Sequence, residues 1–457
     1  MDDDSLLPFC LLCLPAVCHK KVSVAFDGGL LSSDGGVLLL RDVKRRIGVA
    51  ELLAGCLTDQ RDRSRIDHEI VEMLLLRMFL IAAGYEDADD CDSLRGDPVF
   101  KLAVGRLPGS GEALCSQPTM SRLENAPGKV EIARMMAAMV DLFCASWARP
   151  PRAITLDIDD TLDRVHGHQQ LSLFNAHYDE RCFLPIHIYE AGSGKPVTVI
   201  LYPGKTPDGT EVRAIVKHVT RRLRRHWPAT RLCWRGDSHY AWPEAIDWCE
   251  ENGVDYLFEL AGNDALDARI REVADDLCVR RAEASEEKRR TWTAFDHAAK
   301  SWAKPRRVVA RLEATTRGFD ARYVVTTLSG SAERLYETDY CARGRAENFI
   351  KLHKTQLASD RTSQNRRPRQ RRGRANPYPT AFSLLRQGAL PTARRTLSRH
   401  WAMGAGAFAP TNPPPLNPNL DTESRAKAPS TALPTGASSA AGTPQPDLPR
   451  HVVNRSG

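Results

Sequence analysis

The sequence predicts an α/β protein in which a mixed sheet with flanking helices follows a helical N-terminal domain. Three observations predict it. Before residue 150 the apolar residues recur at helical spacing, and after residue 150 short apolar, β-branched runs alternate with helical stretches. Beyond residue 363 no sustained apolar period remains. With 457 residues, the chain is long enough for two or three domains.

The N-terminal domain is expected to span residues 22–150, after a poorly ordered stretch at 1–21. A short strand is predicted at 22–26, followed by a turn and an amphipathic helix that starts near Asp34. Two more stretches have helical spacing. They are residues 67–84 and 129–147.

A short helix is predicted between these two stretches, in SQPTMSRLEN. Ser116 is a plausible N-cap and Pro118 suits the first helical turn. The helix presents residue types that reach phosphates and base edges from a recognition helix, although ordinary exposed helices carry them too. The candidate DNA-binding residues are Gln117, Thr119, Ser121 and Arg122.

The first part of the sheet domain is expected at residues 151–261, after the helix-breaking Arg-Pro-Pro-Arg at 149–152. Three meandering strands are followed by alternating helices and strands, an order similar to the ribonuclease H-like fold. The predicted strands are 153–159, 183–190, 196–202, 231–235 and 254–259, and the predicted helices are 210–226 and 242–252.

An insertion is expected at residues 262–338, before the core resumes at 339–362. Residues 262–306 are charged and expected to be helical, and 307–328 have the pattern of a β-hairpin. The next core helix is therefore delayed until about residue 341.

Four acidic residues lie where this fold would gather them. Asp157 and Asp159 are two apart at the end of a strand, so both side chains point to one face and repel unless a cation neutralises them. Asp237 follows the strand expected beside the first, and Glu347 lies on the delayed helix. Acids so arranged can hold two Mg²⁺ ions. Each acid alone could equally cap a helix or turn.

Glu347 is also part of a charged stripe, Tyr340, Arg343, Glu347, Lys351 and Lys354. At helical pitch these positions share nearly one face, which places a carboxylate among groups that bind phosphate. A solvated helix with intrahelical ion pairs would show the same spacing.

Several long motifs resemble bacterial insertion-sequence transposases of the DDE class, specifically the insertion sequence 1380 family, a relative of the insertion sequence 4 group. The resemblance runs from Val22 to Ser363. The motifs are SSDGGVLLL, GYEDADDCDSLRGDPVFK, SQPTMSRLEN, LDIDDTLDRVHGHQQLSLFN, RGDSHY and the Tyr-Arg-Glu-Lys signature that begins at Tyr340.

The resemblance implies that Asp159, Asp237 and Glu347 ligate catalytic Mg²⁺, with Mn²⁺ as a substitute. The family's Asp-x-Thr pattern favours Asp159 over Asp157, which stays a second candidate. The Tyr, Arg and Lys of the signature would engage the strand at the transposon end. Such enzymes cut at the terminal inverted repeats and join the freed 3′-hydroxyl to target DNA, and a homodimer is expected because two ends must be brought together.

Two other functions fit parts of the sequence. LDIDDTL also satisfies the pattern of haloacid dehalogenase-like phosphatases, with Asp157 as nucleophile and Asp159 as general acid. That pattern normally opens its domain, whereas here it follows 150 residues. A catalytically inactive DNA-binding remnant is the second alternative, because the resemblance stops abruptly near residue 363.

The segment 363–457 is expected to be a disordered basic tail. From residue 361 onward the chain has 14 of its 29 prolines, 15 Lys and Arg, and only three acids. A frameshift in the gene would explain this composition, and a DNA-binding arm is the alternative. Residues 1–360 carry 49 basic against 54 acidic residues, so DNA affinity in this part must come from local patches and metal ions.

The sequence is typical of a cytoplasmic protein. It has no run of about twenty apolar residues, and Asp2, Asp3 and Asp4 stand where a signal peptide needs basic residues. The twelve cysteines follow no regular framework, as expected of reduced thiols.

Overall fold

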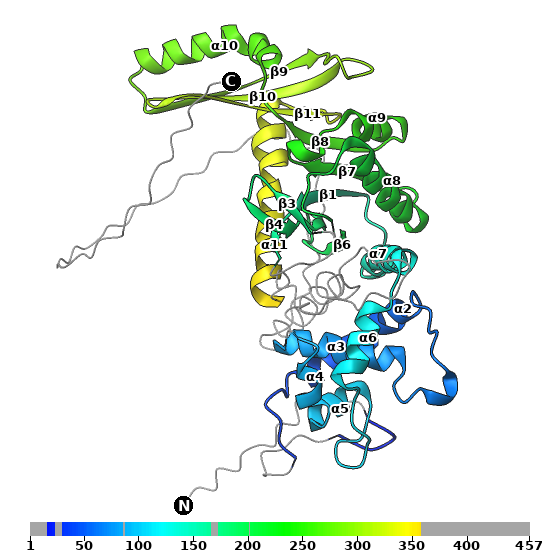
Figure 1. Ribbon diagram of the computed structural model, residues 1–457. Coiled ribbons are helices and arrows are strands. Elements are labelled where there is room, and N and C mark those ends of the chain that lie inside the picture. The colour runs from blue at the N-terminus through cyan, green and yellow to red at the C-terminus, as the bar shows by residue number, and fades with distance from the viewer. Residues whose placement is uncertain (1–15, 23–29, 86, 166–171, 201, 358–457) are drawn as a thin grey trace, which may run out of the picture. The chain divides into compact units, whose positions relative to one another are not determined.

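The computed structural model of the chain describes the segments 16–22, 30–85, 87–165, 172–200 and 202–357 (Figure 1). Most of the strand predicted at 22–26, most of the stretch 1–21 and the whole predicted tail lie outside these residues. No described helix is long and apolar enough to cross a membrane. The ten cysteines in the described segments are all free thiols.

The N-terminal region is helical, as predicted. Its α-helices are α1 (Val37–Ile47), α2 (Val49–Ala54), α3 (Ile70–Ala83), α4 (Asp90–Leu94), α5 (Pro98–Val104), α6 (Gln117–Asn125) and α7 (Lys129–Ala145). The helix predicted from Asp34 is divided in two because Gly48, with φ 68°, takes a left-handed conformation that favours glycine. These helices enclose their own apolar core, to which Leu74, Phe100 and Met120 contribute fully buried side chains.

An eight-stranded mixed sheet follows, with strand order β6-β5-β1-β7-β8-β11-β10-β9. Its strands are β1 (Ala153–Asp160), β5 (Ile186–Glu190), β6 (Pro196–Ile200), β7 (Arg231–Gly236), β8 (Asp255–Leu260), β9 (Lys288–His297), β10 (Arg306–Thr315) and β11 (Gly318–Thr326). Strand β7 is parallel to β1 and β8, and the other neighbours are antiparallel. The first five strands of this order form the predicted ribonuclease H-like core.

The strand predicted at 183–190 is two strands. Phe183 ends β4 (Glu180–Phe183), which forms a separate small sheet with β2 (Asp163–Arg164) and β3 (Leu173–Asn175). The chain then passes to β5 through Pro185, which has no N–H for a continued ladder.

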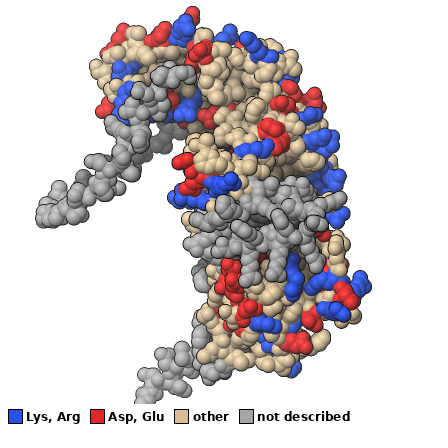
Figure 2. Space-filling model, in the orientation of Figure 1, with Lys and Arg blue, Asp and Glu red and all other residues tan. Residues whose placement is uncertain are grey.

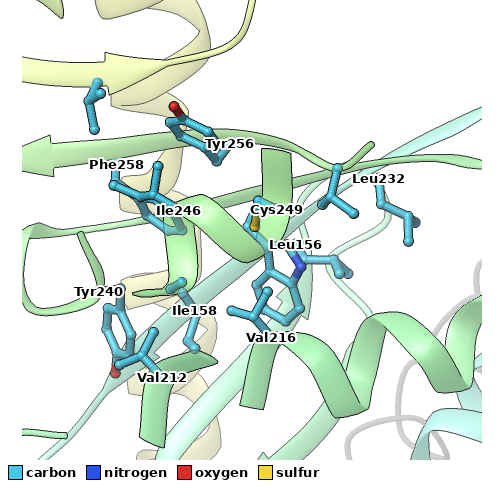
Figure 3. Close-up of a cluster of buried hydrophobic side chains, with 14 of the residues drawn as sticks. Leu156, Ile158, Val212, Val216, Leu232, Tyr240, Ile246, Cys249, Tyr256 and Phe258 are labelled. Carbon is cyan, nitrogen blue, oxygen red and sulfur yellow. The ribbon is translucent and has the colours of Figure 1, made fainter. Parts of the chain in front are cut away.

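One face of the large sheet is covered by α8 (Gly209–His226), α9 (Pro243–Glu251) and α10 (Asp264–Glu283). Figure 3 shows Leu156 and Ile158 of β1 packed among Val212 and Val216 of α8 and Ile246 of α9. Because side chains alternate along a strand, this packing turns the residues at 157 and 159 to the opposite face.

That opposite face is covered by the last helical segments of the described chain. They are the π-helix η3 (Arg334–Tyr340), the 3₁₀ turn η4 (Cys341–Arg343) and α11 (Gly344–Leu357). Leu335 and Tyr336 of η3 pack on Val309 and Val324. In α11, Ala346, Ile350 and His353 are buried, at the spacing of one helix face.

The insertion differs from the prediction. Residues 262–306 are not helical throughout, because α10 ends at Glu283 and β9 follows. The segment Lys288–His297 begins with three basic residues and continues with Thr, Trp and Phe, residue types that are common in strands, and most of its side chains are half-buried. The hairpin predicted at 307–328 is confirmed as β10 and β11, and β11 pairs with β8 so that the insertion extends the core sheet.

The surface of the described residues is mixed in charge. On the face shown in Figure 2, Lys and Arg side chains are interspersed with Asp and Glu. This distribution agrees with the near balance of charges in residues 1–360.

Candidate active site

The ends of β1 and β7 bring two acidic residues to one edge of the sheet. The two strands are parallel, and Asp157 and Arg235 are register partners. Asp159 and Asp237 lie two residues further along their chains. Asp237 is the N-cap of the short 3₁₀ turn η2 (Ser238–Tyr240), where its carboxylate accepts the His239 N–H at 3.0 Å.

Gly236 allows β7 to approach β1 closely at this edge. A Cβ at position 236 would lie 3.0 Å from Ile158 Cγ2 and 3.2 Å from Tyr240 Cβ, tighter than most real contacts. Steric crowding therefore explains why the RGDSHY motif has a glycine directly before Asp237.

Arg343 brings three carboxylates together from three different elements. Its Nη1 lies 3.0 Å from Asp159 Oδ2 and 3.9 Å from Asp237 Oδ2, and its Nη2 lies 3.1 Å from Glu347 Oε1. The structure thus places Asp159, Asp237 and Glu347 around one guanidinium, as the fold order predicts. The side chain of Glu347 is the most exposed of the three acids, at 59%.

The carboxylates around Arg343 are poorly compensated. Burial raises the pKa of Asp159 to about 7, a rise that Arg343 opposes and that repulsion from Asp237 reinforces. Burial also raises the pKa of Asp237, against the attraction of His239 and Arg343. Burial opposes the charge on Arg343, but Asp159 and the other neighbours outweigh it and raise the Arg343 pKa. One cation is therefore shared among three acids.

The residues around Arg343 suit a divalent metal ion, which the sequence resemblance implies. Within the described segments, no three His, Cys, Asp or Glu side chains are spaced to hold an ion together. Here the Arg343 guanidinium contacts all three acids and stands in for a cation. Carboxylate oxygens are the ligands that Mg²⁺ and Mn²⁺ prefer, and burial, the main cause of the raised pKa values of Asp159 and Asp237, disfavours their charged form unless a cation lies near. The three carboxylates are thus of the chemical type that holds such an ion, although here they surround Arg343.

Asp157, the second candidate for the first acid, is engaged elsewhere. Arg235 Nε lies 2.6 Å from Asp157 Oδ1, and Arg235 Nη2 lies 2.8 Å from Asp157 Oδ2. The Asp157 side chain is 0% exposed. A phosphatase of the haloacid dehalogenase type needs this residue as its nucleophile, and a carboxylate held at both oxygens and closed to solvent is unsuited to attack.

The charged stripe is not one regular helix. Tyr340 ends the π-helix, residues 341–343 form a 3₁₀ turn, and the α-helix begins at Gly344, so the pitch changes along the stripe. The Tyr340 hydroxyl donates to Glu259 Oε2 at 2.8 Å.

Lys354 is turned inward, whereas Lys351 is exposed. Lys354 Nζ donates to the Leu162 carbonyl and lies 3.4 Å from Asp163 Oδ1. These contacts fasten α11 to the segment after β1. Lys351 is the member of the stripe that faces solvent beside Glu347.

The short helix α6 exposes few of its candidate DNA contacts. Ser116 and Pro118 occupy the predicted N-cap and first turn, although the Ser116 side chain makes no capping bond. The Gln117 N–H donates to Asp92 Oδ1 at 2.9 Å, and Arg122 Nη2 donates to Thr119 Oγ1 at 3.1 Å. The half-buried members of the set are Gln117, Thr119 and Ser121, and Arg122 is exposed.

Sequence reasoning missed two groups that support this edge of the sheet. Arg235 was available as the residue before the Gly236-Asp237 motif, but only the register of β1 and β7 shows that it pairs with Asp157. The second is Asp160, whose Oδ2 accepts from the Tyr240 hydroxyl at 3.2 Å and lies 3.8 Å from His239 Nδ1. Side-chain pairing across strands leaves no sequence signal.

Comparisons with known proteins identify the family of the chain. The family model described as transposase DDE domain group 1 matches residues 14–371. A solved structure of a piggyBac transposase synaptic complex with hairpin DNA is similar at 11% identity and a TM-score of 0.42, over 82% of this chain and 77% of that chain. No curated protein matches the chain significantly. Since the family model covers well over half of the sequence, the chain belongs to the DDE transposases of that group and is a DDE-type DNA transposase.

Proposed function

We propose that this transposase moves a bacterial insertion sequence of the insertion sequence 1380 family. It binds the terminal inverted repeats of the element as a homodimer, cuts the DNA at the element's end and joins the freed 3′-hydroxyl to target DNA. The observation that carries the proposal is the convergence of Asp159, Asp237 and Glu347 on the Arg343 guanidinium.

The three carboxylates would hold Mg²⁺, or Mn²⁺ in its place. Bound there, the ions would activate a water or a 3′-hydroxyl and stabilise the leaving oxygen. Asp159 and Asp237 come from neighbouring parallel strands, which fixes their separation, and Glu347 closes the site from α11. Asp157 stays bound to Arg235 and serves the scaffold.

Arg343 would alternate between two anionic partners. Without metal it neutralises the acids, and when it moves aside its planar fork suits a DNA phosphate beside them. Lys351 and Arg122 are exposed, and among the described residues the only side-chain partner of the two is Thr119, which accepts from Arg122. Both could therefore reach phosphates directly. Tyr340 and Lys354 would first have to leave Glu259 and Asp163.

The test is Mg²⁺-dependent cleavage of DNA that carries the element's terminal repeats. The parent chain is expected to cut at the repeat end, and Glu347→Gln, which keeps size and removes charge, is expected to lose cleavage while still binding the repeats. A variant that cuts as well as the parent would remove Glu347 from the site. Specific binding without any cleavage by the parent would instead favour the DNA-binding remnant.

A further inference from the structure

A buried ion pair lies two residues before Asp159 and Asp237 on their strands, and its arginine also contacts the segment that precedes Glu347. Asp157 of β1 and Arg235 of β7 are register partners joined by two hydrogen bonds of 2.6 and 2.8 Å. Their side chains are 0% and 6% exposed. The pair thus ties β1 directly to β7 in the sheet interior.

The third contact of Arg235 extends this link to the helical segment. Arg235 Nη1 donates to the main-chain carbonyl of Asp339, near the end of η3. Four residues further on is Arg343, and four more lead to Glu347. One guanidinium therefore contacts β1, β7 and the segment that leads into α11.

The positions of these contacts match the positions of the acids. Asp159 lies two residues after Asp157, and Asp237 two residues after Arg235, so each acid is about 7 Å along its strand from the ion pair. Alternation along a strand keeps Asp157 and Asp159 on the same face. A shift at the ion pair would move the acids of both strands relative to Glu347.

We propose that Arg235 is a positioning residue, which sets the distance of Glu347 from Asp159 and Asp237 by holding Asp157 and the Asp339 carbonyl at once. The inference rests on the proposed function, because the acids that Arg235 would position are the proposed metal ligands. The contacts themselves are independent of that proposal.

The chemistry of the side chain explains why an arginine is needed. A guanidinium has five N–H donors in a planar fork, so it can bind a carboxylate with two and a carbonyl with a third. A lysine would neutralise Asp157 but has no fork with which to hold both partners in fixed geometry. Buried ion pairs add little net stability, so the gain here lies in geometry rather than in folding free energy.

The experiment compares two changes at this pair with a matched arginine elsewhere, all in the full chain. Arg235→Lys keeps the positive charge but removes the planar set of guanidinium N–H donors. The double variant Asp157→Val with Arg235→Met replaces the pair by apolar side chains, a change that proteins often tolerate without loss of stability.

Arg77 provides the control. Its Nε lies 2.8 Å from Glu124 Oε1 and its Nη1 donates to the Asp87 carbonyl at 3.1 Å, with side chains 4% and 10% exposed. Arg77→Lys therefore removes the same kind of contact from the helical region.

Two readouts are measured: hydrogen–deuterium exchange of residues 339–347, and Mn²⁺ affinity by calorimetry without DNA. Both changes at Arg235 should speed exchange at least about tenfold in this segment and weaken Mn²⁺ binding by about 10- to 100-fold, as for other residues that orient metal ligands. Arg77→Lys should alter neither. Unchanged exchange in the double variant, or an equal effect of Arg77→Lys, would overturn the inference.

The two proposals fail in different ways. If Mn²⁺ binding by the parent is absent or survives Asp159→Asn, the proposed metal site is wrong, and the exchange measurement still decides whether Arg235 holds the 339–347 segment. If Mn²⁺ binds through Asp159 and neither readout responds to Arg235, the metal site stands and the positioning role is wrong.

Discussion

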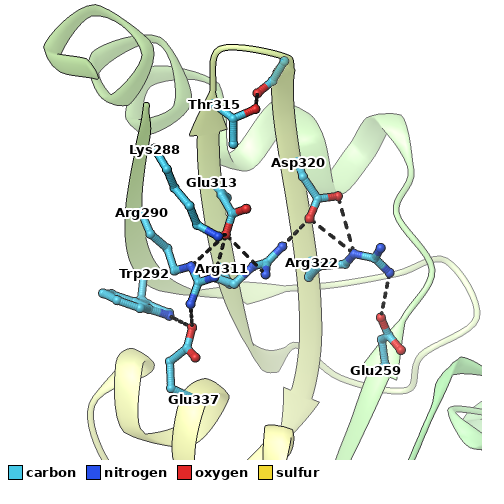
Figure 4. Close-up of polar contacts among 11 residues, drawn as sticks. Glu259, Lys288, Arg290, Trp292, Arg311, Glu313, Thr315, Asp320, Arg322 and Glu337 are labelled. Carbon is cyan, nitrogen blue, oxygen red and sulfur yellow. Dashed lines mark hydrogen bonds and ion pairs between the residues drawn. The ribbon is translucent and has the colours of Figure 1, made fainter. Parts of the chain in front are cut away.

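Two acidic side chains on the same face of the sheet have opposite surroundings. Asp159 is one of three carboxylates that share Arg343. Glu313, on β10 of the insertion, accepts from Lys288 at 2.9 Å and Arg290 at 2.6 Å, and Arg311 lies 3.7 Å away (Figure 4). Asp159 shares Arg343 with two other acids, whereas Glu313 has three cations nearby, two of which also pair with Glu337 and Asp320.

The two side chains are similarly exposed to solvent, at 13% and 15%, but Asp159 lies deeper in the protein than Glu313. The pKa values differ in direction. Burial raises the pKa of Asp159 to about 7, whereas the hydrogen bond from Lys288 lowers the pKa of Glu313. The comparison teaches that burial, together with an excess of acids over cations, marks where a further cation belongs. Glu313 already has its cations, and the acids around Arg343 are short of theirs.

The largest expected effect separates the two sites by activity. Asp237→Asn should reduce strand cleavage by about a thousandfold, since it removes a proposed metal ligand, which would be worth several kcal/mol in the transition state. Glu313→Gln should stay within about threefold of the parent. Single-turnover cleavage rates measure both variants. Equal losses of rate would contradict the distinction between the two sites.

The next effect is a pH dependence that only the Arg343 site should show. Below pH 7 the Asp159 carboxyl is protonated in the metal-free protein and must lose its proton to ligate an ion. Mn²⁺ affinity should therefore rise with pH by up to about 100-fold between pH 5 and 7, and then level off. Calorimetry across this range measures it, and a flat profile would contradict the raised pKa of Asp159.

A smaller effect tests Arg343 as the competing cation. Arg343→Ala should tighten Mn²⁺ binding by about tenfold, because a bound ion would no longer have to displace a guanidinium, even though cleavage should fall with the loss of the proposed phosphate contact. Arg290→Ala, which removes a cation from Glu313, should leave Mn²⁺ affinity unchanged. Weaker Mn²⁺ binding by Arg343→Ala would show that Arg343 supports the ion instead of competing with it.

The sequence predicts the core of this fold well and the insertion poorly, for physical reasons. Strands such as Arg231–Gly236 and helices such as Gly209–His226 have strong local periodicity that matches their final burial. Strand β9 does not, because its charged residues are stabilised by pairing with β10, as Arg290 is by Glu313. Ion pairs with a neighbouring strand leave no apolar pattern within β9 itself.

The same limit applies to the site. The strand order and spacing predict that Asp159, Asp237 and Glu347 approach one another, and the structure brings them around Arg343. The sequence could not choose Asp159 over Asp157 on alternation alone, since both share a face. The pairing of Asp157 with Arg235 supplies that distinction, and it depends on the register of two strands about 80 residues apart.

The measurement that tests the central claim most directly is backbone cleavage by hydroxyl radicals generated at bound Fe²⁺, which takes the place of Mg²⁺. If Asp159, Asp237 and Glu347 hold the metal, cuts should cluster near these three residues, compete away with excess Mg²⁺ and vanish in Asp159→Asn. Cuts that appear instead around Glu313, or that persist in Asp159→Asn, would contradict the account.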